Sequence, residues 1–201
     1  MKSITILFLA AILLQGCTGN TNNPDKAKAE VAKETAKAPL PDGSIFNIKD
    51  TFTTQHNTPM QLVSLQGKPT LIAMIFSNCG YACPRLTADM KAIHDKLGAK
   101  ANQVNFVLVS FDVARDTPAR LEAYTKEQEM TPDWILLHGG EQTVRTLSVL
   151  LNVQYEKDAE GNFSHSNLIS VLDKNGVLAF QKEGIDADHT ETMSTLQKML
   201  Q

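Results

Sequence analysis

Two apolar runs lie in the middle of the chain, at residues 70–76 and 104–111. Nearly uninterrupted runs of this length are typical of strands that are covered on both faces, as in a parallel sheet. Between them, apolar residues fall at i, i+4, i+7 and i+11, which predicts a helix with one buried stripe: Leu86, Met90, Ile93 and Leu97. Gly98 follows this stripe and is expected to end the helix. The three segments together predict a β-α-β unit.

The alternation of strand and helix patterns continues to the end of the chain. A helix is expected from Thr117-Pro118 onward, followed by a short strand at residues 134–137 and a helix that reaches residue 151. Two further strands, at residues 168–172 and 177–180, are joined through Asn175-Gly176, a strong hairpin signal, and a last helix follows. This order predicts an α/β fold with a thioredoxin-like mixed sheet flanked by helices. The strand and helix at 134–151 are expected as an insertion, and residues 45–65 as an N-terminal hairpin.

The first residues have the pattern of an export signal. Lys2 supplies the positive charge, and residues 4–14 are apolar but too few to span a bilayer as a mature helix. Leu14-Gln15-Gly16-Cys17 resembles a bacterial lipobox, in which the cysteine is acylated and becomes the mature N-terminus. We therefore expect a lipoprotein signal peptide at residues 1–17 that ends at a lipidated Cys17. An uncleaved apolar anchor is the alternative.

The composition divides the rest of the chain into two regions. Residues 18–43 are rich in Asn, Lys, Ala, Glu and Pro and cannot supply a core, so we expect a flexible tether. Residues 44–201 are long enough for one domain with a hydrophobic core. Together with the signal, these regions predict a membrane-anchored lipoprotein on the periplasmic side of the bacterial cell envelope.

The overall charge argues against one large class of function. The chain has 19 Lys and Arg residues against 22 Asp and Glu residues, and it has no dense block of basic residues. A surface that binds nucleic acid needs such a concentration of positive charge. We therefore exclude nucleic acid as a partner.

Candidate chemistry centres on a pair of cysteines, Cys79 and Cys83. They follow the first apolar run, and Pro84 is expected at the first position of the next helix, which places Cys83 at the positive end of that helix. A thiol there can have its pKa lowered from about 8.5 to roughly 3.5 to 7.5, so that the sulfur becomes both a nucleophile and a metal ligand. If Cys17 carries lipid, the other two cysteines have only each other. Soft-metal binding and thiol chemistry are the two hypotheses.

His165 is the residue most suited to join the two cysteines. In the expected sheet, the cysteine loop lies beyond the carboxyl end of a central strand, and the antiparallel strand at residue 168 begins at that same end. His165 should therefore face the cysteines. Two thiolates and an imidazole are ligands that suit Cu(I), which tolerates a trigonal shell. Asp112, after the second apolar run, is either an outer group that hydrogen-bonds near the site or a turn residue.

Three blocks of the sequence resemble the Sco/SenC family of copper-binding, thioredoxin-fold assembly proteins. Residues 79–84 match its CxxxCP motif, residues 109–118 match its VDPxRDTP-like segment, and His165 with residues 173–176 matches its histidine block. The resemblance implies that Cys79, Cys83 and His165 are copper ligands, for Cu(I) first and with Cu(II) as an open alternative. It also implies a role in assembling the binuclear copper centre of cytochrome oxidase, with a client such as cytochrome oxidase subunit II as partner. Gly80-Tyr81 stands where the family commonly has an acidic residue, and Val113 where it has proline.

Two alternatives to a metallochaperone stay open. A structural disulfide between Cys79 and Cys83 would close a small loop and remove little chain entropy. Thiol-disulfide exchange on the cysteines of a partner protein is the stronger alternative, with the same two residues as the redox pair. General thioredoxin-like reductases have two residues between their cysteines and a cis-proline opposite them, whereas this chain has three and no proline after Pro132. We therefore expect a copper carrier rather than an enzyme with turnover.

Overall fold

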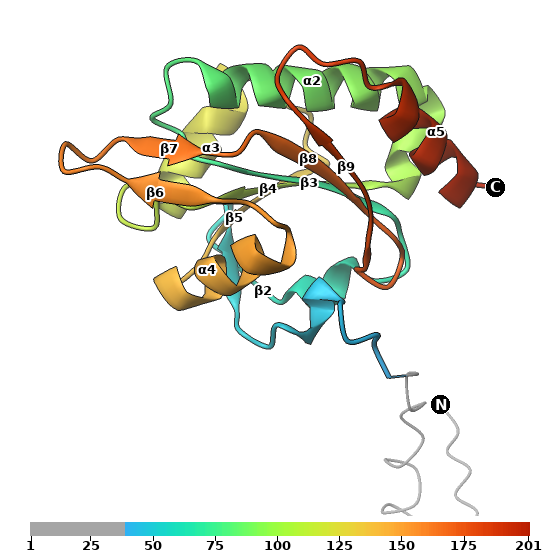
Figure 1. Ribbon diagram of the computed structural model, residues 1–201, viewed down its shortest axis with the longest axis horizontal. Coiled ribbons are helices and arrows are strands. Elements are labelled where there is room, and N and C mark those ends of the chain that lie inside the picture. Colours follow the sequence, from blue (N-terminus) through green and yellow to red (C-terminus); the bar gives the residue numbers. More distant parts are fainter. Residues whose placement is uncertain (1–38) are drawn as a thin grey trace, which may run out of the picture. The chain divides into compact units, whose positions relative to one another are not determined.

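A seven-stranded mixed sheet forms the centre of the protein, with strand order β2-β1-β5-β4-β3-β8-β9 (Figure 1). The computed structural model describes residues 39–201, so the predicted signal peptide, the lipidated Cys17 and nearly all of the predicted tether lie outside the described residues. Across residues 39–201, the helices are too short or too polar to cross a membrane. The mixed sheet flanked by helices confirms the predicted fold class.

The two apolar runs form the central strands. β3 (Thr70–Ile75) lies parallel to β4 (Asn105–Ser110), and all residues of β3 are buried. Helix α2 (Ala82–Leu97) connects them and buries the predicted stripe against the sheet. It ends at Gly98, whose φ of 53° lies in the left-handed region that glycine adopts without a steric penalty. The predicted β-α-β unit is therefore confirmed.

The remaining elements follow the predicted order. α3 (Pro118–Glu127), β5 (Trp134–His138) and α4 (Glu141–Leu150) come after β4, and β5 is parallel to it. β8 (Leu168–Leu172) and β9 (Leu178–Glu183) form the expected hairpin before α5 (Thr190–Met199). The N-terminal hairpin consists of β1 (Phe52–Thr54) and β2 (Pro59–Met60), and β1 extends the sheet beside β5. Three short 3-10 turns complete the fold, at Ile45–Asn47, Leu62–Leu65 and Gly98–Gln103.

The helices cover both faces of the sheet. Figure 1 shows α2 and α5 on one face and α4 on the other. α3 packs beside α2, where the Tyr124 hydroxyl and the Thr87 hydroxyl lie 3.1 Å apart. This two-sided cover explains why β3 and β4 are almost continuously apolar.

One element was not predicted from the sequence. β6 (Tyr155–Lys157) and β7 (Phe163–His165) form a separate two-stranded sheet between α4 and β8. Tyr155 pairs with His165 and Lys157 with Phe163 in this hairpin. His165 is therefore the last residue of a strand rather than part of an irregular loop.

Candidate metal centre

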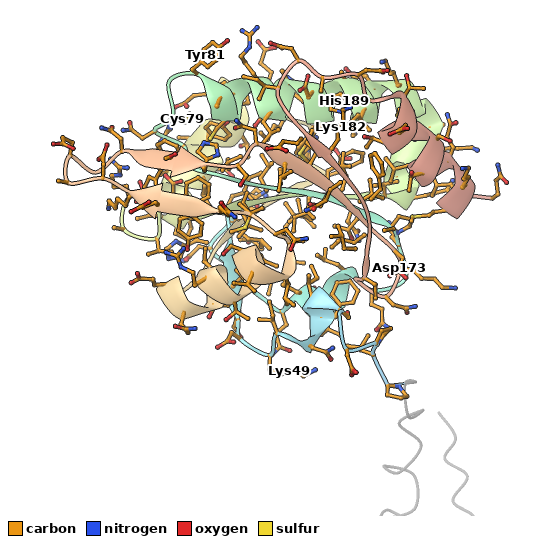
Figure 2. The ribbon with its side chains drawn as sticks, in the orientation of Figure 1. Lys49, Cys79, Tyr81, Asp173, Lys182 and His189 are labelled. Atoms are coloured by element: carbon orange, nitrogen blue, oxygen red, sulfur yellow. The ribbon has the colours of Figure 1, made fainter. Side chains whose placement is uncertain are left out.

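The cysteine loop connects the end of β3 to the start of α2. Cys79 lies in this loop (Figure 2). Cys83 is the second residue of the helix. The helix begins at Ala82, so the prediction that Pro84 takes the first helical position is wrong by two residues. Pro84 still lies in the first turn, where a backbone N–H has no acceptor within the helix and its absence costs little. Cys83 is thus at the positive end of α2, as predicted.

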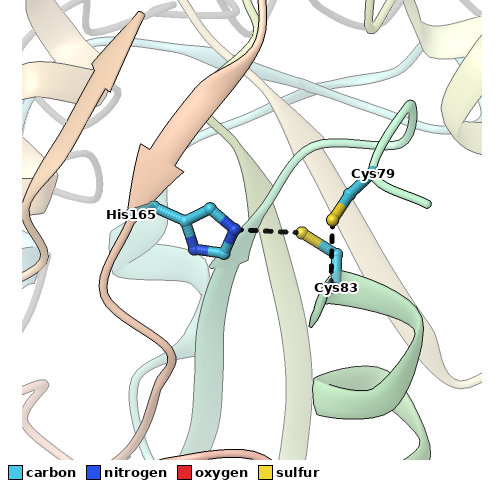
Figure 3. Close-up of side chains that lie close together, drawn as sticks. All are labelled: Cys79, Cys83 and His165. Carbon is cyan, nitrogen blue, oxygen red and sulfur yellow. Dashed lines mark hydrogen bonds between the residues drawn. The ribbon is translucent and has the colours of Figure 1, made fainter. Parts of the chain in front are cut away.

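The two cysteines meet a histidine from a distant part of the chain at this point. The ligand atoms of Cys79, Cys83 and His165 all lie within 4.8 Å of one another (Figure 3). His165 Nε2 is 3.6 Å from Cys83 Sγ, although the two residues are 82 positions apart in the sequence. Cys83 is fully buried, while Cys79 and His165 are partly exposed. Both cysteines are free thiols.

The imidazole of His165 is oriented by its other nitrogen. Nδ1 lies 3.1 Å from the backbone carbonyl oxygen of Ser166. A carbonyl oxygen can only accept, so Nδ1 carries the proton and donates it. Nε2 then has no proton, and its lone pair is directed at the sulfur atoms. This is the tautomer in which Nε2 can bind a metal.

The two cysteines share one negative charge. Hydrogen bonding with the Cys83 side chain and with the backbone N–H of Cys83 and Tyr81 lowers the pKa of Cys79 to about 4, in spite of partial burial. The Cys83 N–H donates to Cys79 Sγ over 3.3 Å, so this sulfur caps the helix. The pKa of Cys83 is raised, because its thiol proton is held against the Cys79 sulfur and because it is buried. Near neutral pH, Cys79 is therefore the thiolate and Cys83 the thiol. The expectation that the pKa of Cys83 is lowered at the start of the helix is wrong, because the backbone N–H of Cys83 stabilises the Cys79 sulfur instead.

Aromatic rings form a wall behind the imidazole. The ring of His165 lies 5.9 Å from that of Phe76 and 5.1 Å from that of Phe111, centroid to centroid. Phe163 packs against both phenylalanines at 5.2 and 5.1 Å, and Tyr155 stacks on Phe111 at 4.9 Å. Phe76 and Phe111 are almost fully buried. This wall keeps water from one side of the sulfur and nitrogen ligands.

A buried carboxylate fixes the start of the cysteine loop. Asp116 is fully buried and accepts hydrogen bonds from the backbone N–H of Ser77 over 2.8 Å, from the Ser77 hydroxyl, and from the Ser110 hydroxyl over 2.6 Å. Arg120 donates to the Ser77 carbonyl oxygen over 3.1 Å. Thr117 caps α3, whereas Asp116 holds the start of the cysteine loop.

Asp112 does not contact the three ligand candidates in the part of the chain that is described. It is buried, and its carboxylate forms an ion pair with Arg115. Arg115 in turn donates to the Gly161 carbonyl oxygen over 2.6 Å, in the turn of the β6–β7 hairpin. Asp112 was expected either as an outer group near the site or as a turn residue, and it is connected to the site indirectly, through Arg115 and the hairpin that carries His165.

The arrangement has the chemistry of a soft-metal site. Two sulfurs and one imidazole nitrogen are a donor set that suits Cu(I), and also Zn²⁺ when a fourth ligand is added. The partial burial of the cluster and its aromatic wall favour a low coordination number. Cys79 remains accessible from the surface beside Tyr81, which is 64% exposed.

A family profile and several known proteins match this chain. The profile of the SCO1/SenC family matches residues 41–201. A SCO1 protein homolog from Bacillus subtilis is 33% identical over 94 residues, which cover 46% of this chain and 49% of that protein. The chain spans about half to three-fifths of the length of the first curated relatives that it matches.

Two solved structures have the same fold. The structure of Bradyrhizobium japonicum ScoI with copper bound is 25% identical, with a TM-score of 0.65, and the match covers 75% of this chain and 96% of that chain. A SCO1/SenC family lipoprotein from Bacillus anthracis str. Ames is 25% identical with a TM-score of 0.69, over 75% of this chain and 92% of that chain. These similarities confirm the predicted thioredoxin-like fold.

The lowered pKa of Cys79 predicts an unusual pH dependence of thiol alkylation. In the reduced native protein, the thiolate fraction of Cys79 is nearly constant above its pKa of about 4. The rate of alkylation by iodoacetamide, followed by peptide mass spectrometry, should therefore stay flat between about pH 5.5 and 8, and Cys83 should remain unmodified. In denaturant, both cysteines should return to the ordinary rise of about tenfold per pH unit below a pKa of about 8.5. A native Cys79 rate that rises in the same way would contradict this assignment.

Proposed function

This chain belongs to the SCO1/SenC family, and on that premise we propose that its domain carries one copper ion as cargo and passes it to a cuproprotein. Cys79 Sγ, Cys83 Sγ and His165 Nε2 are the proposed ligands. The observation that carries the proposal is the meeting of these three atoms within 4.8 Å. Neither the CxxxCP motif alone nor the histidine alone would be sufficient to support a copper site.

Cu(I) is the proposed form of the cargo. Two thiolates and one imidazole satisfy this soft ion without further ligands, and the phenylalanine wall limits the access of water. Binding requires that Cys83 loses its proton, since a metal ligates the thiolate and not the thiol. Loading with copper is therefore expected to release a proton, and the affinity to rise with pH.

Transfer to a client would proceed by ligand exchange at the exposed side of the site. Cys79 is partly exposed, whereas Cys83 lies at the bottom of the site. A cysteine of the client can therefore replace Cys79 first, and the buried sulfur last. Through its family resemblance, the proposed client is a cuproprotein such as cytochrome oxidase subunit II, with its binuclear copper centre.

Copper titration of single variants tests the ligand set. His165→Ala should lower the Cu(I) affinity of the reduced protein but keep a reactive cysteine pair, because only one donor is lost. The double change Cys79→Ser, Cys83→Ser should abolish both Cu(I) binding and thiol reactivity. Competition with the chelator bicinchoninate measures the affinity, and His138→Ala, a histidine at the end of β5 outside the cluster, is the control. Equal affinity in the wild type and in the ligand variants would remove the metallochaperone proposal.

Thiol-disulfide exchange is a second candidate function, favoured by the asymmetry of the cysteine pair. An accessible thiolate beside a buried thiol is the arrangement of an attacking and a resolving cysteine. This function predicts that the metal-free protein reduces a disulfide of a partner protein by forming a Cys79–Cys83 disulfide, and does so catalytically when an added dithiol reduces that disulfide again, with a Cys79→Ser variant inactive. A rate no faster than that of a free dithiol at the same concentration would exclude it as the principal activity.

We further propose that the domain is tethered to a membrane through lipid on Cys17. The lipobox-like segment and the lipoprotein relative from Bacillus anthracis support this proposal. Mass spectrometry of the mature protein should find Cys17 as the N-terminal residue with a diacylglyceryl group, and Cys17→Ala should abolish acylation. A mature N-terminus at Met1 without lipid would contradict it.

A further inference from the structure

We infer that Arg115, held by the buried Asp112, is a positioning residue that fixes His165 in place for copper. The inference rests on the proposed function, because it assigns His165 as a ligand. It concerns the β6–β7 hairpin, whose last residue is His165. Within residues 39–201, the Arg115 side chain donates hydrogen bonds to Asp112 and Gly161 and none to the cysteines or the imidazole, so it acts on the site through this hairpin.

The hairpin is not part of the main sheet. β6 and β7 pair only with each other, whereas the cysteine loop and α2 are attached to the seven-stranded sheet through β3. The pairing of β8 with β3 brings His165 to the same end of the sheet as the cysteines, but no strand pairing joins the hairpin itself to that sheet. Side-chain contacts between the hairpin and the rest of the domain must therefore hold the hairpin in place.

Arg115 makes the contact that reaches the turn of the hairpin. Its guanidinium donates to the Gly161 carbonyl oxygen over 2.6 Å and lies over the ring of Phe163, 5.8 Å from the centroid. On its other side, Nε forms the ion pair with Asp112. The planar guanidinium can do all three at once, which the single ammonium of lysine cannot.

Asp112 anchors this arginine to the rigid part of the domain. Its side chain is only 1% exposed, and its backbone N–H donates to the Ser110 hydroxyl, which itself donates to Asp116. Asp112 is therefore linked through Ser110 to Asp116, the carboxylate that holds Ser77 at the start of the cysteine loop. The cysteine loop and the hairpin are therefore both held by residues at the same end of β4.

Contacts among the aromatic rings link the position of the hairpin turn to that of the imidazole. Phe163, under the guanidinium, packs against both Phe76 and Phe111, and these two rings also contact His165. A displacement of the hairpin turn would shift Phe163 and, two residues later, His165. Loss of Arg115 should therefore weaken copper binding by loosening one ligand, without removing any ligand atom.

A double-mutant cycle on Cu(I) affinity tests this coupling in the full domain. Arg115→Ala should weaken Cu(I) binding by about 10-fold or more, within the range seen when outer partners of metal ligands are removed. In a His165→Ala background, the same change should have less than about a twofold effect, because there is no longer an imidazole to position. Arg115→Lys should recover only part of the affinity. Bicinchoninate competition with Cu(I) alone supplies the affinities, and circular dichroism confirms that each variant is folded.

Lys157→Ala is the matched control. Lys157 also places a cation over the Phe163 ring, 5.4 Å from the centroid, but it belongs to the hairpin and cannot attach it to the domain. Its removal should leave the affinity unchanged within about twofold. Equal losses from Arg115→Ala in both backgrounds, or no loss in either, would overturn the inference while leaving the ligand set intact. If His165→Ala itself has no effect, the proposed function fails, and the positioning role fails with it.

Discussion

The pairing of β3 with both β4 and β8 is the constraint on which the site depends. β3 is parallel to β4 and antiparallel to β8, so that Thr70 pairs with Leu172 and Ala73 with Ile169. The carboxyl end of β3, which leads into the cysteines, therefore meets the amino end of β8, which follows His165. A slip of this register by one residue would exchange the side chains on the two faces of the sheet and move the cysteine loop relative to His165. The same interactions that hold the core together thus bring sulfur and nitrogen donors to one point.

The site combines two ligands on the main sheet and its helix with one ligand on a separate hairpin. α2 and the Asp116 carboxylate hold the cysteines on the rigid sheet, while His165 arrives on a small hairpin that is fastened by side chains. In the proposed carrier role, the domain must bind copper firmly enough to select it and loosely enough to release it. A ligand on a separately attached element is a physical means to that end, since its position can change without unfolding the core.

The sequence predicted those parts of the structure that follow from local periodicity. The apolar runs, the stripe of α2 and the Asn175-Gly176 turn each carry a strong local signal, and with sheet topology they were enough to place His165 opposite the cysteines. The β6–β7 hairpin was missed because its strands are three residues long and largely polar. The role of Asp116 was missed for a related reason: its partner Ser77 lies 39 positions away, and a carboxylate before Thr117-Pro118 fits a helix cap equally well.

The central claim is that two sulfurs and one imidazole nitrogen bind a single copper ion together. X-ray absorption spectroscopy of the reduced domain, loaded with one equivalent of Cu(I), tests it most directly because it counts the neighbours of the metal by element. The account predicts two sulfur neighbours and one nitrogen neighbour, with the nitrogen lost in His165→Ala. A spectrum with a single sulfur, or one that is unchanged by removal of the imidazole, would contradict it.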